Sequence, residues 1–331
     1  MNILITGASG YLGSLLVQRL SNLQTGQPIK IIAADIREAP AFSLNDRIEY
    51  VKLDVRSPDA GHIMAKHQID TVVHLASIVT PGKKSNRDFE YSVDVLGTEN
   101  ILKACVKNGV KRIIVTSSGA AYGYHADHPE WITEEAEIRG NEEFAYSHHK
   151  KLVEQLLDKY RREHPGLEQT IFRIGTILGE TVNNQITALF EKKMMLGIAG
   201  SDSPFVFIWD QDVVCCLEQA VLTGVTGIFN VAGDGKLTVD EIAAKLRKPV
   251  LKVPAFLMKT ILFVLKRLSL TQYGEEQVSF LRYRPVLDNA KLKTVFGYTP
   301  SYTSKEVFEF YIAKNEKMKK QLSSFKAQSY R

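Results

Sequence analysis

The chain opens with Asn2-Ile3-Leu4-Ile5-Thr6 and continues directly into Gly7-Ala8-Ser9-Gly10-Tyr11-Leu12-Gly13. The apolar run predicts a short strand covered on both faces. The Gly-x-x-Gly-x-x-Gly spacing allows a tight turn at Gly7, close approach of a pyrophosphate at Gly10, and close helix packing at Gly13. A helix is predicted over residues 11–20. Its first N–H groups, at Tyr11 and Leu12, and its dipole would face the phosphates.

A second apolar strand, predicted over residues 29–35, ends on Asp35 about twenty residues after the last glycine. An acid at this place accepts hydrogen bonds from both hydroxyls of an adenosine ribose and repels a 2′-phosphate. The cofactor we expect is therefore NAD rather than NADP, although Arg37 could soften this preference. The alternative is that Asp35 only caps the following turn.

Composition limits the class of protein. The 331 residues are 44% hydrophobic and carry a net charge of +5, with no basic stripe interleaved with aromatic residues. We therefore expect a sizeable core and no nucleic-acid partner. Cys105, Cys215 and Cys216 have neither metal-ligand spacing nor a disulfide framework, so no metal site is expected and a reducing cytoplasm is favoured. A strand that starts at residue 2 also leaves no room for a signal peptide.

Strand and helix signals alternate along the first two-thirds of the chain, as a doubly wound parallel sheet requires. We predict an α/β, Rossmann-type fold with a smaller C-terminal α+β part. The dinucleotide-binding domain is placed at residues 1–174, and residues 206–232 are expected to return to it. Residues 175–205 and 233–331 would form the substrate-binding or lid part.

A candidate catalytic group follows the fifth predicted strand. Tyr146 and Lys150 stand four residues apart, hence on one face of a predicted helix. A phenol is a poor base at neutral pH, and a nearby ammonium favours the phenolate. Ser118 follows a buried strand, at the edge where open α/β sheets bind ligands, and could donate a hydrogen bond to the substrate oxygen. The alternative for Ser117 and Ser118 is a turn cap.

Together these motifs resemble the extended short-chain dehydrogenase/reductases, and within them the NAD-dependent epimerase/dehydratase family. The resemblance covers residues 1–240 well and the remainder loosely. It rests on the three glycines, Asp35, Asp54-Val55, His74-Leu75-Ala76, Gly97-Thr98-Glu99-Asn100, Ser117-Ser118, Tyr122-Gly123, Tyr146 with Lys150, Phe172-Arg173, Asp210-Gln211-Asp212-Val213 and Phe229-Asn230-Val231.

The resemblance implies a role for each of these positions. Tyr146 would be the acid/base, Lys150 the anchor of the nicotinamide ribose, and Ser118 a substrate hydrogen-bond donor. The cofactor contacts that it implies are Gly7, Gly10 and Gly13 at the pyrophosphate, Asp35 at the adenine ribose, Asp54 and Val55 along the adenine, and Leu75 and Ala76 beneath the cofactor. A homodimer paired through helices 88–108 and 146–163 is also implied.

The chain departs from the family pattern at several positions. Gly119 and Ala120 stand where dehydratases of the family carry Asp-Glu, and they cannot move protons. Phe205 replaces an arginine that clamps the diphosphate of sugar nucleotides, and Gly175 replaces an asparagine. These losses favour a less charged substrate, consistent with the aromatic residues 205, 207 and 209. The alternative is that Lys192, Lys193 or Arg282 takes over the clamping.

Residues 253–270 are apolar but interrupted by Lys259, Lys266 and Arg267, so they are too broken to span a bilayer. Two interpretations remain open. The segment could be a lid helix packed on the substrate-binding part, which we favour, or a basic amphipathic helix in peripheral contact with a membrane.

Three functions follow from the sequence. The first is an NAD-dependent oxidoreductase of the epimerase/dehydratase type, which transfers hydride at a secondary alcohol or ketone of a small-molecule substrate. The second is a net dehydrogenase or reductase acting on an apolar, sterol- or lipid-like hydroxy compound. The third is a regulatory protein that binds NAD without catalysis, because a fold does not imply an activity.

Overall fold

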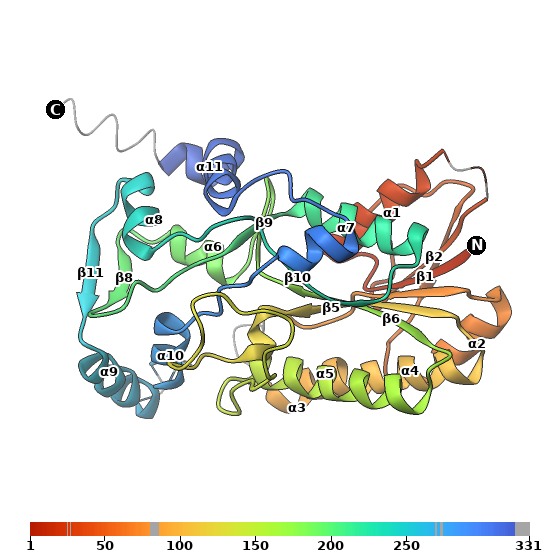
Figure 1. Cartoon of the computed structure of the whole chain (residues 1–331), viewed down its shortest axis with the longest axis horizontal. Helices are drawn as coiled ribbons and strands as arrows, with labels where there is room; N and C mark the ends of the chain where they lie inside the picture. Colours follow the sequence, from red (N-terminus) through yellow and green to blue (C-terminus); the bar gives the residue numbers. More distant parts are fainter. Residues whose placement is uncertain (25, 27, 80–85, 269, 272–273, 322–331) are drawn as a thin grey trace.

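The computed structural model describes residues 1–24, 26, 28–79, 86–268, 270–271 and 274–321. A seven-stranded sheet, parallel throughout, forms the centre of the larger part (Figure 1). Between β1 and β4 the order of the strands reverses, and such a switch point is where open α/β sheets bind ligands. The predicted doubly wound fold is confirmed. In spatial order the strands are β10 (Gly227–Val231), β6 (Glu168–Ile174), β5 (Arg112–Ser118), β4 (Thr71–His74), β1 (Asn2–Thr6), β2 (Lys30–Asp35) and β3 (Ile48–Lys52).

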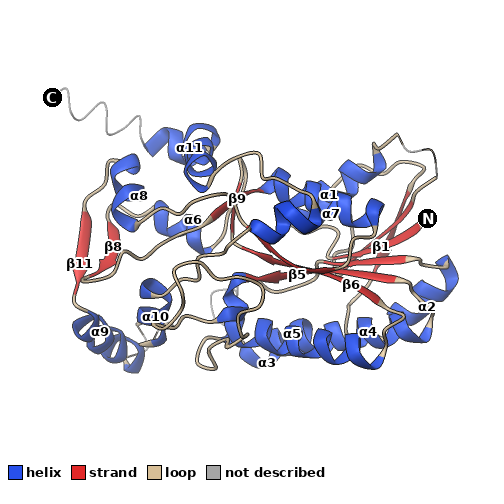
Figure 2. Cartoon of the chain, in the orientation of Figure 1, coloured by secondary structure: helices blue, strands red, loops and turns tan. Residues whose placement is uncertain are grey.

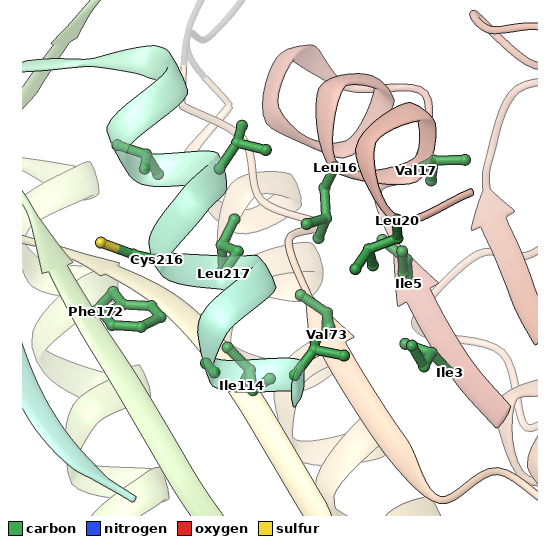
Figure 3. Close-up of a cluster of buried hydrophobic side chains, with 14 of the residues drawn as sticks. Ile3, Ile5, Leu16, Val17, Leu20, Val73, Ile114, Phe172, Cys216 and Leu217 are labelled. Atoms are coloured by element: carbon green, nitrogen blue, oxygen red, sulfur yellow. The ribbon is translucent and has the colours of Figure 1, made fainter. Parts of the chain in front are cut away.

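Helices cover both faces of this sheet (Figure 2). Along β1, Ile3 and Ile5 belong to one buried cluster and Leu4 to the other, because successive side chains of a strand point to opposite faces. Figure 3 shows the first cluster, with Leu16 and Leu217 directed from their helices towards the sheet. The helices of the first cluster are α1 (Tyr11–Ser21) and α7 (Asp210–Thr223), and those of the second are α2 (Asp59–His67), α4 (Gly97–Lys107) and α5 (Ala145–Glu163).

The remaining elements form a smaller part at the carboxyl side of the sheet. In its core Phe207 stacks on Phe205 and Phe308, so these rings fill the core and give no support to an apolar substrate. The strands pair as β7 (Thr176–Leu178) with β9 (Phe207–Trp209) and β8 (Met195–Ile198) with β11 (Val250–Val253). The helices are α6 (Gln185–Phe190), α8 (Val239–Leu246), α9 (Ala255–Arg267), α10 (Glu276–Arg282) and α11 (Ser304–Lys314).

Of the segment expected to return to the sheet, β10 pairs with β6, whereas β9 pairs with β7 outside it. The domain boundaries themselves stay a prediction. The helix expected at 88–108 is divided into α3 (Arg87–Tyr91), a π-helical turn (Ser92–Leu96) and α4. With this wider turn, the Asp94 carboxylate accepts a hydrogen bond from the Ile78 backbone N–H at 2.8 Å.

A buried ion pair joins α5 to the sheet. Arg173 on β6 donates to both carboxylate oxygens of Glu154 on α5, at 3.0 and 2.9 Å. Ser117 on β5 donates to the same carboxylate at 2.6 Å, and Arg173 also donates to the Tyr122 hydroxyl. Both charged side chains are only 4% exposed. The network therefore compensates two buried charges and fixes the helix that carries Tyr146.

A second buried polar link joins β1, β4 and α4 through His74. Thr98 donates its hydroxyl proton to the Asp94 carbonyl oxygen, so the His74 Nε2–H must be the donor in the 3.0 Å contact with Thr98. Nδ1 then accepts the hydroxyl proton of Thr6 at 2.7 Å. Complete burial, together with the nearby charge of Lys150, lowers the pKa of His74 to about 3. His74 is therefore neutral.

Replacing Arg173→Met should destabilise the fold by about 3–5 kcal/mol, because it leaves the Glu154 carboxylate buried without a counter-charge. Urea unfolding measures this. Arg112→Met, which removes a pair with the exposed Glu168 at 2.7 Å, is the matched control and should cost less than about 1 kcal/mol. A double variant Arg173→Met/Glu154→Leu should recover much of the loss. Equal, small effects of both arginine variants would contradict this account.

Because the folded pKa of His74 lies below its ordinary value of 6.5, the unfolded chain takes up a proton that the folded chain excludes. Stability due to neutral His74 is complete above about pH 6.5 and is lost as the pH falls towards 3. The wild type should lose about 3 kcal/mol more than His74→Gln between pH 7 and 4, measured by denaturant unfolding. A His62→Gln variant, changed on the exposed surface of α2, should follow the wild type. A pH-independent difference between wild type and His74→Gln would exclude this role.

Candidate functional site

The glycine turn after β1 has no room for side chains. Gly7 has φ +67°, and a Cβ there would lie 2.7 Å from the Ala76 backbone nitrogen. A Cβ on Gly13 would collide with the Gly7 carbonyl oxygen. The predicted roles of a tight turn and close helix packing therefore have a geometric cause. The same contact brings Leu75 and Ala76, at the end of β4, against the turn.

The N-terminus of α1 is open towards this turn. Gly10 is the N-cap residue, no side chain caps the helix, and its first turn holds no acid. The first N–H groups of a helix lack intrahelical acceptors, so those of Tyr11, Leu12 and Gly13 are available to an anion. An uncapped helix start beside a turn that lacks Cβ atoms at Gly7 and Gly10 fits the pyrophosphate of a dinucleotide. The Tyr11 side chain itself donates to the Asp210 carboxylate at 2.5 Å and ties α1 to α7.

Asp35 lies buried at the end of β2. Its carboxylate accepts hydrogen bonds from the backbone N–H groups of Ser9 at 2.9 Å and Arg37 at 3.1 Å. The Arg37 guanidinium in turn donates to the Ser9 carbonyl at 2.7 Å. These bonds fix the carboxylate beside the glycine turn and leave lone pairs for ribose hydroxyls.

Asp54 and Val55, expected along the adenine ring, each make contacts within the protein itself. The Asp54 carboxylate pairs with Arg56 at 2.6 Å, and this hydrogen bond lowers the pKa of Asp54. Val55 is buried. A Cβ on Gly97 would collide with its Cγ2, so the glycine lets the start of α4 pack closely against Val55. Their predicted contacts with an adenine ring stay a prediction.

Lys150 is buried on α5 and faces the Tyr146 ring, with 5.6 Å between Nζ and the ring centroid. Its ammonium donates to the Ser77 hydroxyl and the Thr116 carbonyl oxygen, both at 3.3 Å. Within the described residues no carboxylate lies in ion-pair distance of it. Burial raises the pKa of Asp94, and the charge of Lys150 opposes this rise. The ammonium is therefore held by neutral oxygens beside the phenol.

The start of α5 is tied to the segment that follows β5. Ser147 donates to the Ala120 carbonyl oxygen at 2.6 Å and accepts from the Asn141 backbone N–H. Ser118 is the last residue of β5, and its hydroxyl accepts from the Ala120 N–H at 3.1 Å. The half-buried Tyr146 and Ser118 are thus positioned by adjoining segments. In the structure Ser118 caps this turn, as the alternative predicted. Its hydroxyl proton is still free to be donated to a substrate.

The structure adds three residues to the predicted site, namely Ser77, Asp94 and Arg284. Ser77 follows the His74-Leu75-Ala76 motif directly, which is a signal that the sequence offered. The charge of Lys150 reaches the Asp94 carboxylate because the π-helical turn places Asp94 near it. The sequence did not indicate this turn. Arg284 lies outside the region of strong resemblance, and only the packing of the smaller part reveals its surroundings.

Arg284 is a buried cation with no carboxylate of the described residues in ion-pair distance. It is 9% exposed, and its Nε is buried without a hydrogen-bond partner. Its Cζ lies 3.8 Å from the ring centroid of Phe205 and 4.7 Å from that of Phe280. Within the described part of the chain its guanidinium donates only a long hydrogen bond of 3.4 Å, from Nη1 to the Ser203 carbonyl oxygen. Burial lowers the pKa of Arg284 to about 9.

Aromatic contacts connect Arg284 to the catalytic helix. Phe280 stacks on Phe144 with centroids 5.6 Å apart, and Tyr124 meets both rings edge-on. Phe144 is the N-cap residue of α5, two positions before Tyr146. A groove of about 570 Å³ adjoins this cluster, lined by Tyr124, by residues 139–143 and by Tyr283 of the segment after α10. Among the described residues, no group of three or more His, Cys, Asp or Glu side chains could hold a metal ion.

Solved structures of similar fold are enzymes of sugar nucleotides. UDP-glucose 4-epimerase of Thermotoga maritima, solved with UDP-glucose, is 21% identical, and the match covers 97% of this chain and 100% of that one with a TM-score of 0.73. UDP-glucose 4-epimerase of Thermus thermophilus, solved with NAD, is 20% identical over 95% of this chain and 98% of that one, with a TM-score of 0.70. At these identities the likeness shows the fold.

Among sequence relatives, an uncharacterised protein of Mycobacterium tuberculosis is 26% identical over 93% of this chain and 82% of its own length. The model of the NAD dependent epimerase/dehydratase family matches residues 3–210, which is more than half of the chain. The resemblance inferred from the motifs, the enzyme class and the cofactor NAD are thereby confirmed. The chain belongs to the NAD-dependent epimerase/dehydratase family of the short-chain dehydrogenase/reductase superfamily.

Proposed function

We propose that this enzyme oxidises a secondary alcohol of a small-molecule substrate, with Tyr146 as the group that takes the hydroxyl proton. The observation that carries the proposal is the buried Lys150 ammonium beside the Tyr146 ring, held by neutral oxygens and unpaired with any carboxylate of the described residues. An ammonium in this position favours the phenolate form. Bound NAD supplies the hydride acceptor.

Other residues would bind the cofactor and position the substrate. The open start of α1 and the glycine turn would hold the pyrophosphate, and Asp35 would accept the adenosine ribose hydroxyls. Lys150 would also donate to the hydroxyls of the second ribose, which places its charge between cofactor and phenol. Ser118 would donate a hydrogen bond to the substrate oxygen and hold it next to Tyr146.

In an epimerase, the oxidised substrate would turn and be reduced on its other face, with Tyr146 returning the proton. In a net dehydrogenase, the ketone would leave instead. Single-turnover absorbance of the reduced cofactor separates the two, because only the dehydrogenase accumulates it in proportion to substrate. The homodimer expected through α4 and α5 stays a prediction.

Arg284 gives the proposal a substrate class. A buried guanidinium without a counter-charge is costly, so an anionic group of the ligand is its natural partner. Its guanidinium covers the ring of Phe205, the residue that replaces the expected clamping arginine. We infer that Arg284, rather than Lys192, Lys193 or Arg282, meets the anion, and that the substrate is a sugar nucleotide or a similarly anionic hydroxy compound. An entirely apolar substrate fits this cation poorly.

Tyr146→Phe should lower turnover by a factor of about 100 or more, because the proton acceptor is lost. NAD affinity should change by less than about twofold, while Lys150→Met should weaken NAD binding about tenfold through lost charge-assisted hydrogen bonds. Calorimetry with NAD and turnover of UDP-glucose, UDP-galactose and UDP-glucuronic acid measure the two effects. Tyr91→Phe, on the partly exposed α3, is the control. Full turnover by Tyr146→Phe would refute the assignment, and NAD binding without any turnover on an extended substrate panel would favour the regulatory alternative.

Arg284→Met should weaken binding of UDP and UDP-sugars to the NAD complex about thirtyfold, because one partner of a buried charge pair is removed. The same variant should melt at an equal or higher temperature than the wild type when no anion is present, since an uncompensated buried charge is gone. Thermal shift with UDP, UDP-glucose and inorganic phosphate measures both. Arg282→Met, which removes the neighbouring arginine, should keep the affinity. A variant that is destabilised but binds UDP normally would show that Arg284 is only structural.

A further inference from the structure

Almost the whole apolar surface of α9 faces outwards. Met258 is its one buried residue, and with Leu262 it packs on Ile198, Val278 and Leu281 of β8 and α10. The helix thus has a narrow attached side and a wide free side. Its exposed large hydrophobic residues, with Leu251 of β11 and two residues after the helix, are Leu251 (50% exposed), Phe256 (74%), Leu257 (42%), Ile261 (41%), Phe263 (49%), Val264 (46%), Leu268 (62%) and Leu270 (69%).

These side chains form one surface, which we call the α9 surface. By helix geometry Phe256 and Phe263 lie opposite Met258, whereas Leu257, Ile261, Val264 and Leu268 lie along one flank of the helix. Leu196 of β8 is also exposed and pairs in register with Leu251 of β11, beside the start of the helix. In Figure 1, β8, β11 and α9 lie together at the end of the molecule opposite the N-terminal strands.

The charged side chains of the segment that contains α9 are all basic. Residues 242–274 contain seven Lys and Arg and no Asp or Glu, while the rest of the chain contains 35 basic and 37 acidic residues. The positive net charge of the protein therefore resides in this segment. Lys245, Lys252 and Lys266 pair with Glu309, Asp240 and Glu276 at 2.6, 2.7 and 3.5 Å. Within the described part of the chain neither Lys259 nor Arg267 of α9 has a carboxylate in ion-pair distance, so these two charges are free to meet a ligand.

We propose that the α9 surface docks on a membrane of negatively charged lipids, with α9 lying in the plane of the interface. Its exposed apolar side chains would enter the acyl boundary, and Lys259 and Arg267 would meet lipid phosphates. No described helix is long and apolar enough to cross a bilayer, so the contact is peripheral. The inference is independent of the reaction proposed above.

A second copy of the chain fits this surface less well. A two-fold interface would place the same positive segment against itself, and like charges across an interface oppose association. A surface of anionic lipids instead supplies opposite charge along the whole helix. The lipid surface is also fluid enough to receive bulky residues such as Phe256 and Phe263, which are 74% and 49% exposed.

Co-sedimentation of the full chain with vesicles tests the proposal. The wild type should bind phosphatidylcholine vesicles containing 30% phosphatidylglycerol about tenfold better than pure phosphatidylcholine vesicles, and this preference should fall with added salt. Phe256→Ser/Leu268→Ser should reduce binding about tenfold. The matched control is Leu222→Ser/Val295→Ser, which removes two exposed apolar residues elsewhere (44% and 60% exposed) and should bind normally.

A second pair of variants tests the charge. Lys259→Gln/Arg267→Gln should lose the preference for anionic vesicles, whereas Lys107→Gln/Lys111→Gln should keep it. Unchanged calorimetric binding of NAD confirms that each variant is folded. Absence of vesicle binding by a wild type that binds NAD would overturn the proposal, as would equal binding to both kinds of vesicle. Concentration-dependent dimers that vanish in Phe256→Ser/Leu268→Ser, without vesicle binding, would instead assign the surface to a second copy.

Discussion

Close approach of backbone segments at the carboxyl edge of the sheet is the constraint on which the site depends. The turn at Gly7 lies so near Ala76 that a Cβ would find no space, and this contact sets the end of β1 against the end of β4. Ser77 follows at once and accepts a hydrogen bond from Lys150, which faces Tyr146. One line of contacts therefore runs from the glycine turn to the phenol of Tyr146, the two places to which we assign cofactor binding and proton transfer. A larger residue at position 7 would disturb both ends of it.

Buried charged side chains near the sheet edge fall into two kinds, paired and unpaired. Arg173 and Glu154 neutralise each other completely, with further bonds from Ser117 and to Tyr122, and so serve the fold. Lys150 and Arg284 are also buried cations, but among the described residues neither has a carboxylate partner. A fold tolerates such groups only where a ligand supplies the missing charge, or where their cost is offset by function. The contrast separates the paired charges Arg173 and Glu154, which serve the fold, from the two cations that we propose meet a ligand.

Local patterns were enough to predict the first half of the chain. The alternation of strand and helix patterns predicts the parallel sheet, which the structure confirms, and the glycine spacing agrees with the lack of room for a Cβ at Gly7 and Gly13. The acid at the end of β2 and the Tyr146–Lys150 spacing depend on backbone geometry within a few residues, but their roles stay predictions. The π-helical turn around Asp94 escaped prediction because its cause is the distant N–H of Ile78. Phe205 and Arg284 are nearly eighty residues apart, so their contact could not be inferred from a sequence window. The aromatic residues at 205 and 207 suggested an apolar substrate, yet tertiary packing uses them as core.

For residues 253–270 as well, the sequence alone could not decide between two structures. Their composition permitted both a packed lid and a surface helix, because an amphipathic pattern does not reveal what covers its apolar face. The structure shows that only a narrow side of α9 is covered, by α10 and β8. The exposed apolar face and the uniformly positive segment then reinforce each other: hydrophobic exposure alone would fit any partner, and positive charge alone any anion. Their coincidence on one helix narrows the choice to a surface that is both apolar and anionic.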